Sequence, residues 1–302
     1  MTMHAAKPEN AVPLTAKIAD KTADVIRLTL PKASFVTSRI LPAVSAIAAR
    51  AIPPLVMLVL LLTVWQILCM KPGATLPSPT KIWVEAHDLI VDPFFVAGPQ
   101  DIGLGWRVLT SLQRVAIGYG LAGVIGILLG TLIGQSVWAM RGLDPIFQVL
   151  RTISPLAWLP ISLAAFRDSQ PSAIFVIFIT SIWPIIINTA VGIRNIPQDY
   201  RNVAAVLRLN QFEFFAKIMI PSAAPYIFTG LRIGIGLSWL AIVAAEMLTG
   251  GVGIGFFIWD AWNSSRLSDI IVALAYIGAI GFVLDRLVAL IATVVTRGTA
   301  AN

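Results

Sequence analysis

The sequence predicts an all-α integral membrane protein with six transmembrane helices. Hydrophobic residues fill 57% of the 302 positions and charged residues only 12%, which is about half of the usual charged share in a soluble domain. The mean hydropathy of the chain is +0.84. Six segments supply the roughly 20 apolar residues that cross a hydrocarbon core about 30 Å thick.

The predicted membrane domain covers residues 51–297 and follows a leader at residues 1–50 that mixes charged, polar and apolar positions. We expect the leader to be cytoplasmic and partly disordered or interfacial. No small-residue cleavage site follows the first span, so that span is predicted to be retained. The six predicted spans are Ile52–Met70, Val115–Gly134, Ile146–Phe166, Pro171–Ile193, Ala224–Leu248 and Ile270–Val295.

Small residues in one of these spans and prolines in another predict how the two helices pack and bend. The second span carries Gly126, Gly130 and Gly134 at a spacing that places all three on one helix face. Such a ridge lets two helices approach closely in lipid, so we expect it to pack against a neighbouring span. Pro155 and Pro160 remove backbone donors from the third span, which we expect to be kinked.

Basic residues predict the orientation of the chain. Lys and Arg are concentrated ahead of the first span and in the segment 194–221, which places both on the cytoplasmic side. An even number of spans then returns the C-terminus to the cytoplasm. The same residues account for the isoelectric point of 9.9, so the basic balance does not call for a nucleic-acid partner.

Several kinds of chemistry find no support in the sequence. Its single cysteine, Cys69, and its two histidines, His4 and His87, lie far apart and predict no metal site. No span supplies a His/Asp/Glu set suited to catalysis. The chain also lacks the GxxxxGK[ST] phosphate-binding loop, so any ATP that drives transport must be bound by another chain.

Charged residues inside the spans are candidates for function because each costs about 2.5–3.5 kcal/mol to insert. Arg232 and Asp285 come to similar depth if their helices are antiparallel neighbours, so we predict that they form an ion pair. A role for the pair in fixing helix register and a direct role in anion passage both remain open. Candidates for the pore or substrate path are Arg114, Arg151, Arg232, Gly234, Ser238 and Glu246. We expect Glu246 near the outer rim.

The segment 194–221 is a polar, charged stretch between two apolar spans. Its pattern N-V-A-x3-R-x9-I-x-I-P resembles the EAA loop of binding-protein-dependent ABC importer permeases, which is written E-A-A-x3-G-x9-I-x-L-P. Asn202, Val203 and Arg208 stand where that loop has Glu, Ala and Gly. The segments NVAAVLRL, Pro225–Gly250 and Gly251–Ser264 also resemble the nitrate, sulfonate, taurine and bicarbonate branch of the family, with the nitrate members nearest.

The resemblance implies a type I importer permease core with one extra N-terminal helix, placed in the inner (plasma) membrane of a bacterial cell. Such a permease works as a pair, expected here to be a homodimer, with two cytoplasmic ATPase subunits and an external or lipid-anchored binding protein. ATP and Mg would then lie on the ATPases, and this chain would bind no cofactor. The segment 194–221 would be the coupling loop, with contact residues Asn202, Val203, Ala204, Arg208, Phe212, Phe215, Ile218 and Pro221.

The coupling loop is expected to form two short helices, the first capped by Asp199 or Asn202 and ended by Asn210. Arg208 would favour continuation of the first helix or bind an acidic residue of the ATPase. The favoured substrate is nitrate, with nitrite or cyanate as companions. Aliphatic sulfonates, taurine and bicarbonate are rivals, and a secondary transporter without an ATPase is a further alternative, for which the sequence shows no convincing internal repeat.

Overall fold

The computed structural model describes residues 35–71, 75–98 and 101–296, and helices joined by loops make up these ranges. The only strand-like feature within them is an isolated antiparallel bridge between Val96 and Ile102. The predicted all-α fold class is therefore confirmed. The chain divides into two units, residues 1–68 and 69–302, and most of α2 (Phe35–Cys69) belongs to the first.

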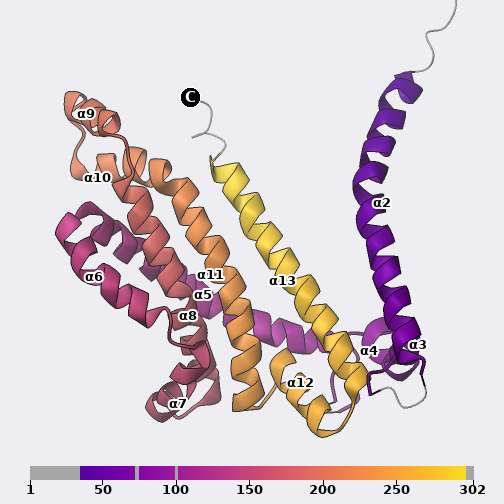
Figure 1. The fold of residues 1–302 in the computed structure, drawn as a ribbon. Helices are drawn as coiled ribbons and strands as arrows, with labels where there is room; N and C mark the ends of the chain where they lie inside the picture. The colour runs from indigo at the N-terminus through magenta and orange to yellow at the C-terminus, as the bar shows by residue number, and fades with distance from the viewer. Residues whose placement is uncertain (1–34, 72–74, 99–100, 297–302) are drawn as a thin grey trace, which may run out of the picture. The chain divides into compact units, whose positions relative to one another are not determined.

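The second unit contains a series of long and short helices, shown in Figure 1. The short helices near its start are α3 (Pro79–Glu85) and α4 (His87–Val91). The remaining helices are α5 (Leu104–Gln135), α6 (Val137–Leu150), α7 (Pro155–Phe166), α8 (Ser169–Arg194), α9 (Gln198–Val206), α10 (Gln211–Phe214), α11 (Ile220–Thr249), α12 (Ile254–Asn263) and α13 (Leu267–Thr296).

Within the described residues, five helices are long and apolar enough to cross a membrane. They lie at Ala51–Cys69, Leu104–Gln135, Ser169–Arg194, Gln211–Thr249 and Leu267–Thr296. The number becomes six if the bent pair α6 and α7 makes one crossing. The second and fourth of these helices begin more than ten residues before the predicted spans, because their first turns carry polar residues.

The third predicted span is wrong as a single kinked helix. The structure has two helices, α6 and α7, with an angle of 92° between them. The break falls at residues 151–154, where Ser154 is extended (ψ 133°) because a residue that precedes proline is disfavoured in the helical region. Pro155 then starts α7, where its missing N–H costs nothing. Pro160 lies inside α7 without ending it.

The core of the second unit is formed where α8 packs against α5 on one side and against α11 on the other. The glycine ridge of α5 makes the close approach that its spacing predicts. A Cβ atom on Gly126 would meet Ile185, and one on Gly130 would meet Thr189, both on α8. From α11, Gly230 faces the backbone of Pro184 in the same way. Small residues therefore hold α8 between its two neighbours.

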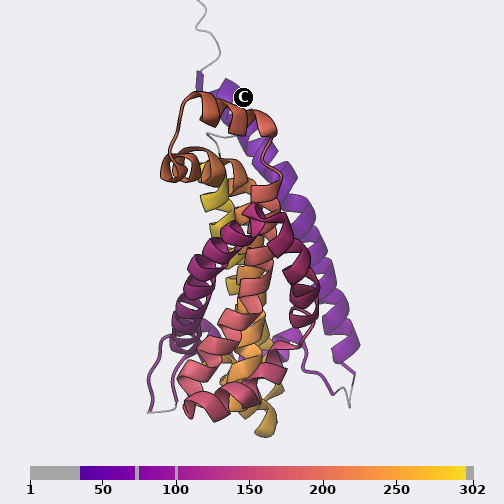
Figure 2. The same ribbon diagram turned by 90° about the vertical axis from the view of Figure 1, so that its left-hand side faces the viewer.

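The two ends of α8 and α11 carry different structures. Figures 1 and 2 both place α9 and α10 at one end and α12 at the other. A π-helical turn, Phe215–Met219, joins α10 to α11, so the backbone stays helical from Gln211 to Thr249. On the remaining side, α13 packs along α11, where the Trp239 indole donates to the carbonyl of Ile277 at 2.9 Å.

Candidate coupling and substrate-path sites

The segment between α8 and α11 forms two short helices, but their caps differ from the predicted ones. Pro197 precedes α9 and gives no side-chain cap, while Asn202 lies in the middle of the helix and accepts from the Gln198 amide. Capping by Asp199 or Asn202 was therefore a wrong prediction. Asp199 instead occupies the first turn, where a carboxylate is favoured by the helix dipole.

The end of α9 depends on Arg208, which adopts a left-handed backbone conformation (φ 51°). The Leu209 N–H donates to the carbonyl of Ala204, and the Arg208 N–H donates to that of Ala205, both at 3.1 Å. This pair of bonds is the Schellman arrangement that closes a helix, and its left-handed position usually holds glycine. The expectation that Arg208 continues the helix is therefore wrong: the turn of the family's glycine is kept with arginine in it.

Asn210 starts α10 rather than merely ending α9. Its side-chain oxygen accepts from the Glu213 N–H at 2.7 Å, and the Glu213 carboxylate accepts from the Asn210 N–H at 3.1 Å. This reciprocal capping box satisfies two backbone donors that have no partner within the helix. It fixes the direction in which the chain enters the helix leading to α11.

The predicted contact residues differ in how far they are exposed. Phe212 is 76% exposed, and Val203 and Val206 are exposed as well. By contrast, Ala204 is buried, and Phe215 packs against the apolar cluster around Met219. Ile218 and Pro221 are half-buried, whereas Asn202 and Arg208 are exposed. Tyr200, Val203 and Leu207 share one face of α9 by their spacing, and we call Tyr200, Val203, Val206, Leu207 and Phe212 the exposed apolar set.

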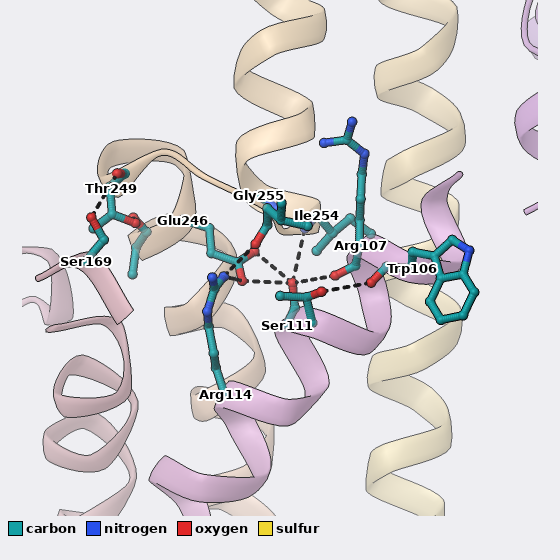
Figure 3. A network of polar contacts seen from close by, with 12 residues as sticks. Trp106, Arg107, Ser111, Arg114, Ser169, Glu246, Thr249, Ile254 and Gly255 are labelled. Carbon is teal, nitrogen blue, oxygen red and sulfur yellow. Dashed lines mark hydrogen bonds and ion pairs between the residues drawn. The ribbon is translucent and has the colours of Figure 1, made fainter. Parts of the chain in front are cut away.

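A buried polar network occupies the opposite end of α11 (Figure 3). Glu246 has 0% exposure, and its Oε1 accepts from Arg114 Nη1 at 2.6 Å. The Ser111 hydroxyl donates to the same carboxylate, whose oxygens lie 2.9 and 2.8 Å away. The Gly255 N–H donates to Oε2 at 3.0 Å. One carboxylate thus joins α5, α11 and the start of α12.

The loop between α11 and α12 wraps closely around this carboxylate. Arg114 also donates to the carbonyl of Val252 at 2.8 Å, and the Ile254 N–H donates to the Ser111 hydroxyl at 3.1 Å. A Cβ atom on Gly253 would collide with the Glu246 carboxylate, so only glycine fits there. The sequence singled out Arg114 and Glu246 separately as path candidates, but nothing in it linked them to each other or to Ser111.

Arg232 and Asp285 lie opposite each other on α11 and α13. Arg232 Nε is 2.5 Å from Asp285 Oδ1, and Nη2 is 2.7 Å from Oδ2. The guanidinium fork therefore faces the carboxylate with two parallel bonds, a geometry that fixes the register of two helices. Both side chains remain partly exposed.

Gly234 and Ser238 lie in the packed interior rather than on an open face. A Cβ atom on Gly234 would lie 3.3 Å from Ile185 of α8. Ser238 is fully buried, and its hydroxyl has no hydrogen-bond partner among the described residues. The sequence placed both in the lining of a pore between two permease copies, which stays a prediction; within this chain, Gly234 contacts α8.

Arg151 lies at the break between α6 and α7 and lines a cavity of about 390 Å³. The other walls come from α7, α8 and α11 and include Trp183, Asn188 and Ile233. Among the described residues, the Arg151 guanidinium forms no ion pair or hydrogen bond, unlike the guanidinium groups of Arg114 and Arg232. The structure therefore separates the three arginines into two paired residues and one cavity residue.

Comparison with known proteins identifies the family to which this chain belongs. Residues 122–298 match the family described as binding-protein-dependent transport system inner membrane component. The chain belongs to this family. It is therefore a membrane transport subunit and not an enzyme, and the family description implies a separate binding protein and, as an ABC importer, a separate ATPase.

Individual relatives align over most of the chain. The nitrate import permease NrtB of Synechocystis sp. is 60% identical over 82% of this chain and 90% of its own length. The protein of the same name from Leptolyngbya laminosa is 61% identical over 81% of this chain and 87% of its own length. The bicarbonate transport system permease protein CmpB of Synechocystis sp. is 52% identical over 82% and 89%.

A solved structure agrees on the fold. A chain of the MetNI methionine ABC transporter, described as inward facing, superposes with a TM-score of 0.57 at 14% identity. The match covers 64% of this chain and 96% of that chain. The predicted type I importer permease fold is thus confirmed.

Proposed function

We propose that this chain is the transmembrane permease subunit of an ATP-driven importer that carries nitrate into the cytoplasm. The observation that carries the proposal is the 60–61% identity to two nitrate permeases over about four fifths of the chain. Nitrite and cyanate are small anions of similar size and charge and would be companion substrates. Bicarbonate is the second candidate, because bicarbonate permeases reach 52–54% identity over three quarters or more of the chain.

The coupling role belongs to the end of the unit that carries α9 and α10. The exposed apolar set offers side chains that a groove on an ATPase can cover, as in other complexes of a helix with a groove. The helix from Gln211 to Thr249 has no break, so a displacement of its first turns moves its whole length. Closure of the ATPase pair on ATP would then reopen the path by rigid-body rotation.

The assembly that follows has two copies of this permease, two ATPase subunits that bind ATP and Mg, and an external solute-binding protein. Residues 194–221 face the cytoplasm as the coupling loop, and both chain termini lie on the same side. The charge bias of the sequence supports this orientation, because basic residues are concentrated ahead of the first span and in that loop. Lipid surrounds the exposed apolar faces of the spans.

The experiment that tests the substrate is labelled uptake in a bacterium from which the genes for this chain have been deleted. Restoring the chain with its ATPase and binding protein should restore uptake of labelled nitrate, and excess unlabelled nitrate should compete far better than bicarbonate. A strain that carries the permease without the ATPase is the control and should stay inactive. Nitrate uptake that is unaffected by the deletion, together with restored bicarbonate uptake, would transfer the assignment to bicarbonate.

A further inference from the structure

The cavity beside Arg151 lies at the middle of the spans that surround it. Thr180 and Trp183 stand near the midpoint of α8, and Ile233 and Leu237 stand near the midpoint of α11. Arg151 enters from the break between α6 and α7. The molecule therefore brings one cation to half the depth of its helical bundle.

A cation at this depth is costly unless it has a function. Insertion of an arginine at the middle of a membrane costs about 2.5–3.5 kcal/mol, and such residues face a bundle interior or a water-filled path. The other two arginines among the path candidates are neutralised by Glu246 and Asp285. Among the described residues, Arg151 has no carboxylate partner. Its charge is available to a mobile anion.

We propose that this cavity is a transient binding subsite for a small, weakly hydrated, monovalent oxyanion. The inference rests on the proposed function and gives the transported anion a stopping point within the permease itself. A guanidinium offers paired N–H donors that match two oxygens of a planar oxyanion. The amide of Asn188 lies in the same wall and has a second N–H beyond the one that donates to the Pro184 carbonyl, whereas the nearby Thr180 hydroxyl donates to the Val176 carbonyl.

The lining of the cavity sets the kind of anion that it admits. Apolar and aromatic side chains dominate it, including Trp158, Trp183 and Ile179. An anion that enters must give up much of its water, and one cation with the Asn188 amide replaces only a few of the lost hydrogen bonds. Nitrate holds its water weakly because its charge is spread over three oxygens. Bicarbonate and sulfate hold water more strongly and are disfavoured.

A purely structural role would also place a cation at position 151. The residue stands at the C-terminus of α6, where a positive charge is favoured by the helix dipole. The capping bonds themselves are made by its backbone N–H, which donates to the carbonyls of Phe147 and Val149. The side chain is not needed for those bonds. A test must therefore separate the attraction of anions from the stability of α6.

Thiol chemistry gives a readout that does not depend on transport. Cys69 is the single cysteine, so Cys69→Ser gives a clean background for Thr180→Cys in the complete transporter. We would compare the rates at which a sulfonate-bearing and a trimethylammonium-bearing methanethiosulfonate modify the introduced thiol. Arg151→Gln should lower the ratio of the anionic to the cationic rate by about fivefold or more, because one nearby charge is removed.

Two controls make this result specific. Arg141→Gln removes an exposed cation of α6 that does not line the cavity, and it should leave the ratio unchanged. Excess nitrate should slow the anionic reagent more than an equal concentration of strongly hydrated fluoride does. A ratio that is the same with and without Arg151, or equal slowing by both anions, would overturn the subsite. If Arg151→Gln fails to assemble, the comparison of nitrate with fluoride decides.

Uptake measurements distinguish a failure of the subsite proposal from a failure of the proposed function. Arg151→Gln should lower maximal nitrate uptake about tenfold with an unchanged half-saturation concentration, because the binding protein sets that concentration. Arg151→Lys should retain part of the rate. Wild-type transport of nitrate with full activity in Arg151→Gln would reject the subsite alone. If the unmodified transporter does not carry nitrate, the proposed function is rejected. The thiol-modification rates would still report on anion binding in the cavity.

Discussion

Glu246 is a carboxylate with no exposed surface, and the groups that balance its charge come from other segments of the chain. Arg114 supplies the opposite charge from α5, and Ser111 and the Gly255 N–H supply hydrogen bonds. Such a buried pair contributes little net stability when it is complete, because removing two charges from water is costly. Its loss is expensive when one partner is removed, because the other charge stays buried. Arg114 is only 13% exposed.

We therefore predict that Glu246→Ala destabilises the permease by about 3–5 kcal/mol, the range for breaking a buried pair on one side. The thermal midpoint of the purified transporter measures this loss. The double variant Arg114→Met with Glu246→Gln should recover part of it, since no uncompensated charge remains. Losses that simply add in the double variant would show that the two side chains do not act as a pair.

The Arg232–Asp285 pair illustrates how far single residues can be read from the sequence. Depth alone brought the two residues together, because each lies about a dozen residues from the predicted cytoplasmic end of its span. The structure has them in a bidentate contact between α11 and α13. The partner of Glu246 had no such signal, because Arg114 lies on a helix whose neighbours are set by packing.

At the scale of elements, the turn after α9 keeps its left-handed backbone conformation although arginine stands in place of the family's glycine. Arg208 takes the left-handed conformation at a position where glycine is usual, at a cost of about 1 kcal/mol. Two backbone hydrogen bonds and the capping box of α10 surround the turn and hold it. The spacing of the motif, and not the identity of this residue, determines where α9 ends.

Substitution of Arg208 separates the turn from the charge. Arg208→Gly should keep the turn and leave thermal stability unchanged or slightly raised. Arg208→Val should lower stability by about 1–2 kcal/mol, because a β-branched side chain is strained at positive φ. Limited proteolysis between α9 and α10 should be faster in Arg208→Val alone. Equal cleavage in all three proteins would contradict the strain, and loss of uptake in Arg208→Gly with intact stability would assign a role to the charge.

The broken element formed by α6 and α7 marks the limit of reasoning from local patterns. Apolar content across residues 146–166 predicted one span, and the prolines predicted only a kink. The 92° bend falls at residues 151–154, where the N–H groups of Arg151, Thr152 and Ile153 still donate to carbonyls of α6 and the chain leaves the helical region at Ser154. Whether the chain bends here depends on the packing of α8 and α11 beside the break. The bend therefore cannot be predicted from the local composition.

At the scale of the whole molecule, the proposed function links opposite ends of one long helix. Phe212 and Glu246 belong to the same helical stretch and are separated by about 50 Å at 1.5 Å per residue. A π-helical turn at Phe215–Met219 lies between them, as does Pro225 inside α11, and π-helical turns are frequent at functional sites. Movement at the coupling end therefore reaches the network around Glu246 through a continuous backbone.

Charge placed on the exposed apolar set should uncouple the transporter. We predict that Phe212→Glu or Val203→Glu lowers both ATPase co-purification and nitrate uptake at least tenfold, because a carboxylate in an apolar interface stays without a partner. The control is Asn202→Glu, which adds the same charge to α9 and matches the usual residue of the family motif. Normal assembly and uptake in both Phe212→Glu and Val203→Glu would reject the coupling role.

The sequence by itself determined the membrane class, the helical fold, most spans and the family. These properties follow from apolar runs, glycine spacing and a motif of fixed length, all of which are local along the chain. The sequence also indicated the charged residues that matter, because charge is costly inside a membrane.

Only the tertiary structure decided what each of those residues does. It paired Arg114 with Glu246, packed Gly234 against α8, buried Ser238, and left Arg151 facing a cavity. The physical reason is that burial and charge compensation depend on which helices are neighbours. That choice is made by packing between segments more than a hundred residues apart, as with Ser111 and Glu246. No local pattern records it.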